Sequence, residues 1–195
     1  MTHPLVTVIT PTTYDRSEFN DRIASMIQNQ DYAGEIEHIF DYGNGTIGAK
    51  RNAMVKQASG EIIIHADSDD IYLPTYFTNA VATLQQSKCR LIGLHKFPMH
   101  NVRTNDVHIF DNPGYIAEAT FCYYKEGFPG FHDISINEGL PVMKQLKYAS
   151  YSSTDFMATV HGGNTCGHKT LPLIKKLPPD EAGAVLNHFY TTLPQ

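Results

Sequence analysis

The stretch Glu61-Ile62-Ile63-Ile64-His65-Ala66-Asp67-Ser68-Asp69-Asp70 decides which kind of fold this chain forms. A continuous apolar run that is rich in β-branched residues is typical of a strand covered on both faces. The run passes directly into an acidic cluster, Asp67 to Asp70, with three carboxylates in four residues. A buried strand that ends in acids predicts a mostly parallel sheet with a functional site beyond the carboxyl ends of its strands.

The segments around this strand alternate between strand and helix patterns. We expect strands at residues 5–10 and 35–40, and helices after each of them and from Pro74 onward. The first helix carries an apolar stripe up to Ile27 and can be capped by Asp15 or Ser17. This order predicts an α/β fold: a doubly wound, mostly parallel sheet with helices on both faces.

Residues 48–58 form the second expected helix. Its alanines and Val55 are placed on the inward face, and Lys50, Arg51 and Asn52 on the polar face. Because the carboxyl ends of parallel strands share one edge, the loop at Thr12, Asp41 and the acidic cluster are expected to meet on one rim.

The pattern is weaker after about Leu91. We expect strands near residues 90–97, 107–110, 117–124 and 157–160, a helix over 138–147, and a helical tail after Pro172. We interpret residues 1–195 as one domain with a nucleotide-binding half, 1–97, and an acceptor-binding half, 98–195.

The composition narrows the class of protein. A chain of 195 residues can bury a substantial core, and 42% hydrophobic and 18% charged residues are ordinary for a folded protein. A net charge of -5 argues against a nucleic-acid partner. The odd count of three cysteines favours a reducing compartment, so we expect a cytoplasmic protein. We expect no transmembrane segment, and peripheral attachment to a membrane stays open.

Three carboxylates on a partly buried rim repel one another unless a cation or nearby donors offset their charge. Oxygen ligands of this kind suit Mg²⁺ or Mn²⁺, which complete their shells with water and substrate phosphates. The alternative is that the acidic cluster caps the next helix and faces solvent.

The residues before the cluster favour the metal site. Gly48-Ala-Lys-Arg-Asn52, Ala58-Ser-Gly-Glu61, the isoleucines and the acidic cluster resemble, without a gap, the family 2 glycosyltransferases of the GT-A fold. Residues 6–12, with Tyr14 and Arg16, resemble the first strand and donor-binding loop of that family. The resemblance covers roughly residues 5 to 85 and is loose beyond them.

The resemblance implies transfer of a sugar, with inversion, from a nucleotide-sugar donor to an acceptor hydroxyl. We expect a UDP-sugar as donor, a glycan, lipid-linked or other hydroxyl acceptor, and Mn²⁺ or Mg²⁺ as cofactor. Asp69 is the implied metal ligand, and a solvated helix face stays open for Lys50 and Arg51. The implied donor-binding residues are Pro11, Thr12, Thr13, Asp15, Arg16, Asp41, Lys50, Arg51, Asn52, Asp67 and Ser68.

An inverting transferase needs a carboxylate that takes the proton of the acceptor hydroxyl. The family supplies it from a Glu-Asp pair, and the matching place here is Glu138-Gly139, so the second acid is missing. Glu138 is the first candidate base and Asp133 the second. A role for Glu138 in stabilising a helix N-terminus stays open.

A late histidine completes the predicted site. His161 follows the last expected strand, and neutral imidazole can ligate Mn²⁺, so His161 is a candidate metal ligand. His168 is the second choice. Together with Cys166 the two histidines could also suggest zinc, but their spacing matches no common zinc motif and a fourth ligand is not evident.

Other functions fit parts of the sequence. Residues 43–48 match Gly-x-Gly-x-x-Gly, as in dinucleotide-dependent oxidoreductases, but follow the second strand and leave the acidic cluster unexplained. A nucleotidyltransferase would normally carry a glycine-rich loop after the first strand, and residues 11–16 contain no glycine. A degenerate GT-A domain that binds nucleotide or glycan without catalysis is the remaining alternative.

Overall fold

The sheet grows outward from β1 (Val6–Pro11), which pairs in parallel with β2 (Ile36–Asp41) on one side and β3 (Ile62–His65) on the other. The computed structural model describes residues 3–163 and 174–193. The other strands, in chain order, are β4 (Ile71–Tyr72), β5 (Leu91–Asn101), β6 (Asp106–Asp111), β7 (Cys122–Tyr124), β8 (Tyr148–Ser152), β9 (Phe156–Val160) and β10 (Ile174–Lys176).

The main path of the sheet is β10-β6-β5-β7-β3-β1-β2. Strand β7 is antiparallel to both of its neighbours, β3 and β5, so these two strands run in the same direction. Following the pairings, β1, β2, β3, β5, β8, β9 and β10 run one way, and β4, β6 and β7 run the other way. The mostly parallel direction predicted from the sequence is therefore confirmed, with antiparallel strands inserted in its second half.

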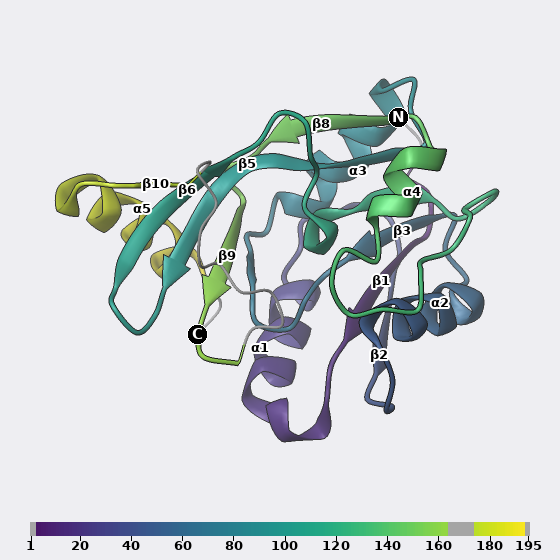
Figure 1. The fold of residues 1–195 in the computed structure, drawn as a ribbon, viewed down its shortest axis with the longest axis horizontal. Helices are drawn as coiled ribbons and strands as arrows, with labels where there is room; N and C mark the ends of the chain where they lie inside the picture. The colour runs from purple at the N-terminus through teal and green to yellow at the C-terminus, as the bar shows by residue number, and fades with distance from the viewer. Residues whose placement is uncertain (1–2, 164–173, 194–195) are drawn as a thin grey trace.

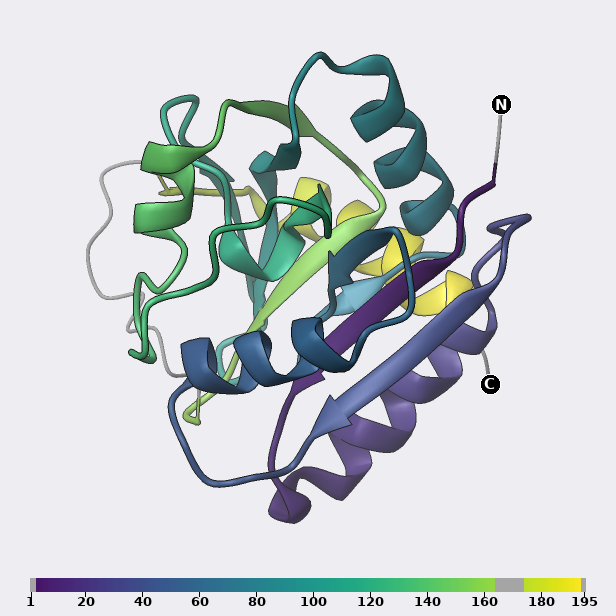
Figure 2. The same cartoon turned by 90° about the vertical axis from the view of Figure 1, so that its right-hand side faces the viewer.

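Helices cover both faces of this sheet, as predicted. They are α1 (Ser17–Gln28), α2 (Ile47–Gln57), α3 (Tyr76–Gln86), α4 (Leu140–Gln145) and α5 (Pro179–Thr192). Figure 2 shows α1 and α2 on opposite sides of the strands β1 and β2, and Figure 1 shows the labelled order of the elements. Among the described residues, no helix combines the length and apolar character needed to cross a membrane.

The strand residues alternate between two apolar cores because successive side chains point to opposite faces. Ile62 and Ile64 pack in the core that contains residues of α1, α3 and α5, whereas Ile63 packs in the core of α2 and α4. Both cores are closed to solvent at β3, since all three isoleucines are fully buried. The apolar run that follows Glu61 therefore forms a strand that is covered on both faces, as predicted.

The structure corrects the predicted orientation of α2. Lys50 and Arg51 are buried, while Ala53, placed inward by its apolar character, is exposed. Apolar and polar residues are not segregated to opposite faces of helix α2, so its residue pattern does not predict which face turns inward. The solvated-face alternative for Lys50 and Arg51 is therefore wrong.

Three local expectations also change. The first helix follows a 3-10 turn, Tyr14–Arg16, and no side chain caps it. Residues 117–124 hold a second 3-10 turn, Glu118–Thr120, before the short β7. Glu138 lies before α4 and not within it.

Candidate functional site

The carboxyl ends of β1, β2 and β3 meet on one rim, as the sheet order requires. Backbone N–H of Thr12 donates to the carbonyl of Asp41 at 3.0 Å, and Thr10 Oγ1 donates to the Ala66 carbonyl at 2.7 Å. Thr12 Oγ1 also lies 3.4 Å from Ser68 Oγ. These contacts bring the donor-binding loop predicted after β1 next to the end of β2 and the acidic cluster.

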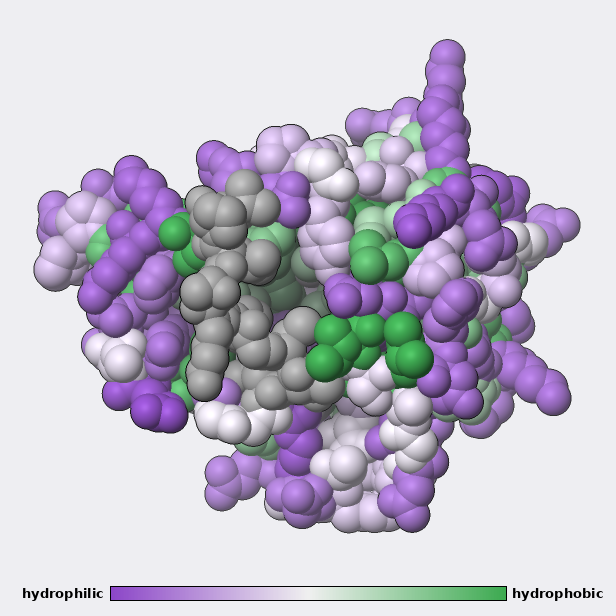
Figure 3. All heavy atoms as spheres, in the orientation of Figure 1, coloured by the Kyte–Doolittle hydropathy of each residue, from purple (hydrophilic) through white to green (hydrophobic). Residues whose placement is uncertain are grey.

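A cavity of about 250 Å³ opens beside this rim. Its polar wall combines the acidic cluster with arginines and with two glutamates from the second half of the chain, and the far wall is apolar. Figure 3 shows a hollow on the face seen in Figure 1, with strongly hydrophobic surface next to it. The charged residues that line the cavity are Arg16, Arg51, Asp67, Asp69, Asp70, Glu118 and Glu138.

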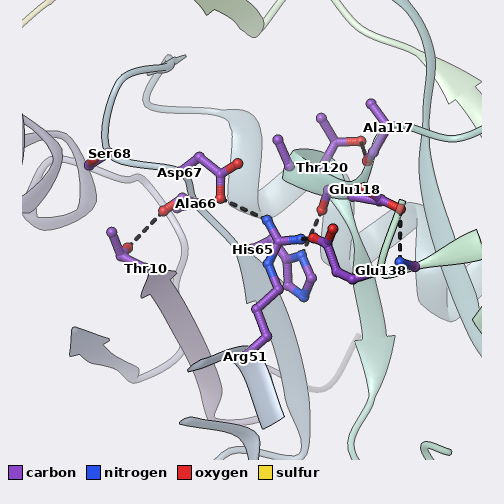
Figure 4. A network of polar contacts seen from close by, with 12 residues as sticks. Thr10, Arg51, His65, Ala66, Asp67, Ser68, Ala117, Glu118, Thr120 and Glu138 are labelled. Carbon is purple, nitrogen blue, oxygen red and sulfur yellow. Dashed lines mark hydrogen bonds and ion pairs between the residues drawn. The ribbon is translucent and has the colours of Figure 1, made fainter. Parts of the chain in front are cut away.

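Arg51 is the buried centre of the polar wall. Its side chain is 2% exposed, Nη2 donates to Asp67 Oδ1 at 2.9 Å, and Nη1 donates to Glu138 Oε1 (Figure 4). Burial disfavours the charged guanidinium, but the carboxylates of Asp67 and Glu138 raise the pKa of Arg51 above its ordinary value. Arg51 therefore joins the end of β3 to the segment before α4 through a permanently charged group.

Gly48 explains how α2 comes close enough to make these contacts. Its N–H donates to the Ile134 carbonyl at 3.0 Å, and a Cβ at this position would lie 1.8 Å from the carbonyl oxygen of His132. Only glycine allows this backbone approach. Thr46 caps the helix by accepting a hydrogen bond from Ala49 N–H at 3.1 Å. The last glycine of the Gly-x-Gly-x-x-Gly match thus packs against the chain itself, which weakens the dinucleotide interpretation.

Asp67 and Asp70 are costly to ionise in this setting. Burial raises the pKa of Asp67, and the neighbouring Arg51 offsets part of that shift. Burial, followed by the nearby Asp69 and Asp67, raises the pKa of Asp70 well above its ordinary range. Asp70 Oδ1 accepts a hydrogen bond from Thr159 N–H at 2.8 Å, which fixes its position. A cation at this end of the cavity would lower the cost of ionising the cluster.

The structure brings Asp69, Arg16 and His161 together. Arg16 Nη2 donates to Asp69 Oδ2 at 2.7 Å, and His161 Nε2 lies 2.9 Å from the same oxygen. Arg16 Nη2 is also 3.2 Å from His161 Nε2. Phe19 supports the group, since its ring stacks on the imidazole with a centroid separation of 5.2 Å. These three side chains come from the β1 loop, the β3 end and the β9 end.

The other predicted donor residues make different contacts, and most of them do not line the cavity: Thr12, Thr13, Asp15, Asp41, Lys50, Asn52 and Ser68. Lys50 Nζ donates to the Thr12 carbonyl at 2.5 Å and so helps to hold the loop after β1 in place. Asn52 exchanges two hydrogen bonds of 2.8 Å with the backbone of Phe131. Asp41 Oδ1 accepts from Gly43 N–H at 2.7 Å. Pro11 lines the cavity, and Arg16 is partly buried.

The outer part of the β1 loop is open to solvent. Thr13 and Asp15 are exposed, and a hydrogen bond from the Thr13 side chain is the main cause that lowers the pKa of Asp15. Tyr14 is 78% exposed and stacks on Tyr42 with a centroid separation of 4.6 Å. Two stacked rings beside Asp41 form a flat aromatic surface at the edge of the rim.

Three predicted residues lie away from the cavity or outside the described residues. Asp133 is exposed, does not line the cavity, and accepts a hydrogen bond from Thr46 Oγ1. Cys166 and His168, which the zinc alternative required, lie outside the described residues. Among the residues that are described, no group of three or more His, Cys, Asp or Glu side chains could hold a metal ion alone.

Glu118 is a cavity residue that the sequence reasoning missed. Glu118 Oε1 accepts a hydrogen bond from Gly139 N–H at 2.8 Å, and its backbone carbonyl lies 2.6 Å from His65 Nδ1 (Figure 4). Burial and the nearby Glu138 raise the pKa of Glu118 to about 7, against a lowering effect of Arg51. One signal was available, since Glu118 is the only charged residue between Asn112 and Tyr124.

Comparison with solved structures finds a similar architecture in proteins of low sequence identity. Staphylococcus aureus TarS, residues 1–349, in complex with UDP-GlcNAc matches with a TM-score of 0.59 and 15% identity, over 96% of this chain and 66% of that one. The mannosyltransferase PcManGT from Pyrobaculum calidifontis, in complex with GDP-Man and Mn²⁺, matches with a TM-score of 0.59 and 14% identity, over 84% and 59%. This likeness shows the fold: the chain has the GT-A fold of glycosyltransferases.

The comparisons go no further than the fold. No protein-family model matches the chain, and no curated protein matches it in sequence. The chain also spans less than two thirds of each of the TarS and PcManGT structures, with 43% as the smallest share.

Proposed function

We propose that this chain is a metal-dependent glycosyltransferase of the family 2 type. It moves a sugar from a nucleoside-diphosphate donor to an acceptor hydroxyl, with inversion at the anomeric carbon. The observation that carries the proposal is the convergence of Arg16, Asp69 and His161 beyond the carboxyl ends of β1 and β3: Arg16 and Asp69 line the cavity, and His161 Nε2 lies 2.9 Å from Asp69 Oδ2. Ligands of open α/β sheets bind at this place, and these groups suit a diphosphate with its cation.

The rim offers separate surfaces for the parts of a donor. The stacked Tyr14 and Tyr42, beside Asp41, present a flat aromatic surface and an acceptor oxygen for a nucleobase. Thr12 contacts both Asp41 and Ser68, so we assign Thr12 and the neighbouring Thr13 to the ribose. Arg16 then faces the diphosphate. TarS binds UDP-GlcNAc and PcManGT binds GDP-Man, so a UDP-sugar is the first donor to test here and GDP-mannose the second.

The residues at the end of the rim fit a divalent cation. Asp69 Oδ2 and His161 Nε2 are an oxygen and a nitrogen ligand that converge, and diphosphate oxygens can complete the shell of Mn²⁺ or Mg²⁺. When bound, the cation would neutralise the charge that develops on the leaving diphosphate. Arg16 shares the same carboxylate oxygen, so its side chain must turn away from Asp69 and toward the phosphates.

The second half of the chain closes the acceptor side. The far wall of the cavity is apolar, with the following side chains: Phe97, Met99, Phe110, Tyr115 and Phe156. We propose that a glycan, lipid-linked or other hydroxyl acceptor enters along this wall. Asp67 and Arg51 then face the donor sugar from the opposite wall.

Asp69→Ala tests the proposal. Wild-type protein with Mn²⁺ is expected to bind UDP or GDP in calorimetry and to release nucleotide slowly from UDP-GlcNAc or GDP-mannose. The variant removes the carboxylate on which Arg16 and His161 converge. We expect it to lose the Mn²⁺-dependent part of nucleotide binding, at least about 100-fold in Kd.

Asp111→Ala is the matched control, because Asp111 forms an exposed ion pair with Lys96 and does not line the cavity. Wild-type protein that binds neither nucleotide with Mn²⁺ would contradict the transferase proposal. Nucleotide binding without any turnover would instead support the degenerate GT-A domain, and intact Mn²⁺-dependent binding by Asp69→Ala would remove Asp69 from the metal site.

A further inference from the structure

We propose that Glu118 is the catalytic base of this enzyme and that it takes the place of the acid missing at Gly139. The proposal rests on the proposed transferase function and assigns its proton acceptor. Glu118 reaches the site from the 3-10 turn before β7, whereas the expected acid pair precedes α4.

The space beside Gly139 is the first argument. A Cβ on Gly139 would lie 2.9 Å from Glu118 Cγ and 3.0 Å from Glu118 Oε1. The Glu118 side chain therefore occupies the volume into which a side chain at position 139 would project. An acid at 139 and the present position of Glu118 exclude each other, so the glycine and the glutamate belong to one arrangement.

The carboxylate of Glu118 is also held in place. Its Oε1 accepts the hydrogen bond from Gly139 N–H at 2.8 Å, and this is its single side-chain hydrogen bond among the described residues. The backbone of the turn is fixed by His65 Nδ1 at the Glu118 carbonyl and by Thr120 Oγ1, which donates to the Ala117 carbonyl at 2.7 Å. A positioned carboxylate at the cavity wall meets the geometric requirement for a general base.

The two acids expected as bases are committed elsewhere. Glu138 is 3% exposed at its side chain and pairs with the buried Arg51, so protonating it would remove one of the two carboxylates that offset the Arg51 charge. Asp133 is exposed and does not line the cavity. Glu118 does line the cavity, together with Asp67 and Arg51 of the donor side.

The charges around Glu118 suit this role. Glu138 and Asp67 face it with negative charge, Arg51 faces it with positive charge, and the buried His65 lies at its backbone. Burial and Glu138 together hold the pKa of Glu118 at about 7. A base with a pKa near the working pH is partly ionised there and still accepts a proton strongly.

The proposed step balances as follows. The acceptor oxygen forms a bond to the anomeric carbon as the bond from that carbon to the diphosphate oxygen breaks. The electron pair of the broken bond leaves with the nucleoside diphosphate. The proton of the acceptor hydroxyl passes to the Glu118 carboxylate and then to solvent. Water can replace the acceptor in this step, so donor hydrolysis reports the same base.

Glu118→Gln tests the role without an identified acceptor. The amide keeps an oxygen for Gly139 N–H but cannot take the proton. We measure nucleotide release from UDP-GlcNAc and from GDP-mannose with Mn²⁺, and nucleotide binding by calorimetry. We expect release to fall by about 100-fold or more, with the Kd for nucleotide changed by less than about threefold. In the wild type, release should rise with pH through about 7, and this rise should vanish in the residual rate of the variant.

Glu126→Gln is the matched control, because Glu126 is an exposed glutamate of the same half and does not line the cavity. Release by Glu118→Gln above about a tenth of the wild-type rate would overturn the role of Glu118, as would a loss of activity in Asp133→Asn instead. A wild type that binds nucleotide but releases none from either donor would also overturn it. A wild type that binds no nucleotide at all would contradict the proposed function itself.

Discussion

The two halves of this molecule organise their residues in opposite ways. Residues 5–86 build a parallel β2-β1-β3 unit in which each strand is followed by a helix, and the proposed donor site lies where these strands end. Residues 87–193 instead gather β6, β7, β8 and β9 around the single long strand β5. In the first half, short connections position the functional side chains. In the second half, the pairing of segments that are distant in sequence positions them.

Arg51 contacts Asp67 in the first half and Glu138 in the second half. Of the changes considered, we expect its replacement to have the largest effect on the free energy of unfolding. Arg51→Met leaves Asp67 and Glu138 without their shared cation, so we expect a loss of about 3–5 kcal/mol in the free energy of unfolding. Urea denaturation measures the change. Lys96→Met breaks an exposed pair and should cost less than about 1 kcal/mol. Equal losses in the two variants would show that the halves are not joined through Arg51.

Gly48 tests the same junction through the backbone. A methyl group at this position would collide with the carbonyl of His132, so Gly48→Ala should destabilise the chain by about 3 kcal/mol. The matched control is Gly183→Ala in α5, where nothing lies within 4 Å of the added Cβ. That variant should gain about 0.5–1 kcal/mol from the higher helix propensity of alanine. If a thermal melt shows that both variants are more stable than the wild type, that result would contradict the close approach of α2 to the second half.

The pH dependence of the free energy of unfolding provides a test with a smaller expected effect, whose sign follows from the raised pKa of Glu118 in the second half. The pKa of Glu118 is raised from 4.5 to about 7 on folding, so its protonated form favours the folded state. This contribution is fully present below about pH 4.5 and is lost as the pH rises through about 7. Between pH 5 and 8 the wild type should therefore lose on the order of 2 kcal/mol more than Glu118→Gln. Parallel stability curves for the two proteins would show that Glu118 ionises as freely in the folded chain as in the unfolded one.

The two halves also differ in how much of their fold could be predicted from the sequence. The helices and strands up to residue 86 were readable from local patterns, because each element buries its own apolar face next to its sequence neighbour. The two-residue strand β4 was too short to leave a pattern, and β8 exists because β5 offers it a partner. Such pairings depend on tertiary context, which no local window contains.

Some residues of the candidate site could be predicted from the sequence, and others could not. Asp67, Asp69, Arg16 and His161 were named from the sequence. The first three line the cavity, and His161 contacts Asp69 and Arg16. The inward direction of Lys50 and Arg51 was missed because the face of α2 that turns inward is charged and is satisfied by partners far along the chain. Glu118 was missed because its meaning depends on contact with Gly139, in a region where no local motif links the two.

The insertion of β7 between β3 and β5 also affects how the chain can be synthesised. The edge of β3 that carries three consecutive isoleucines receives its partner only when Tyr124 has left the ribosome, long after the β1 and β2 edges are paired. Until then the nascent chain presents an uncharged, β-branched strand edge of the kind that pairs with other chains. Fragments that end before Cys122 should therefore be poorly soluble, because this edge of β3 stays unpaired in them.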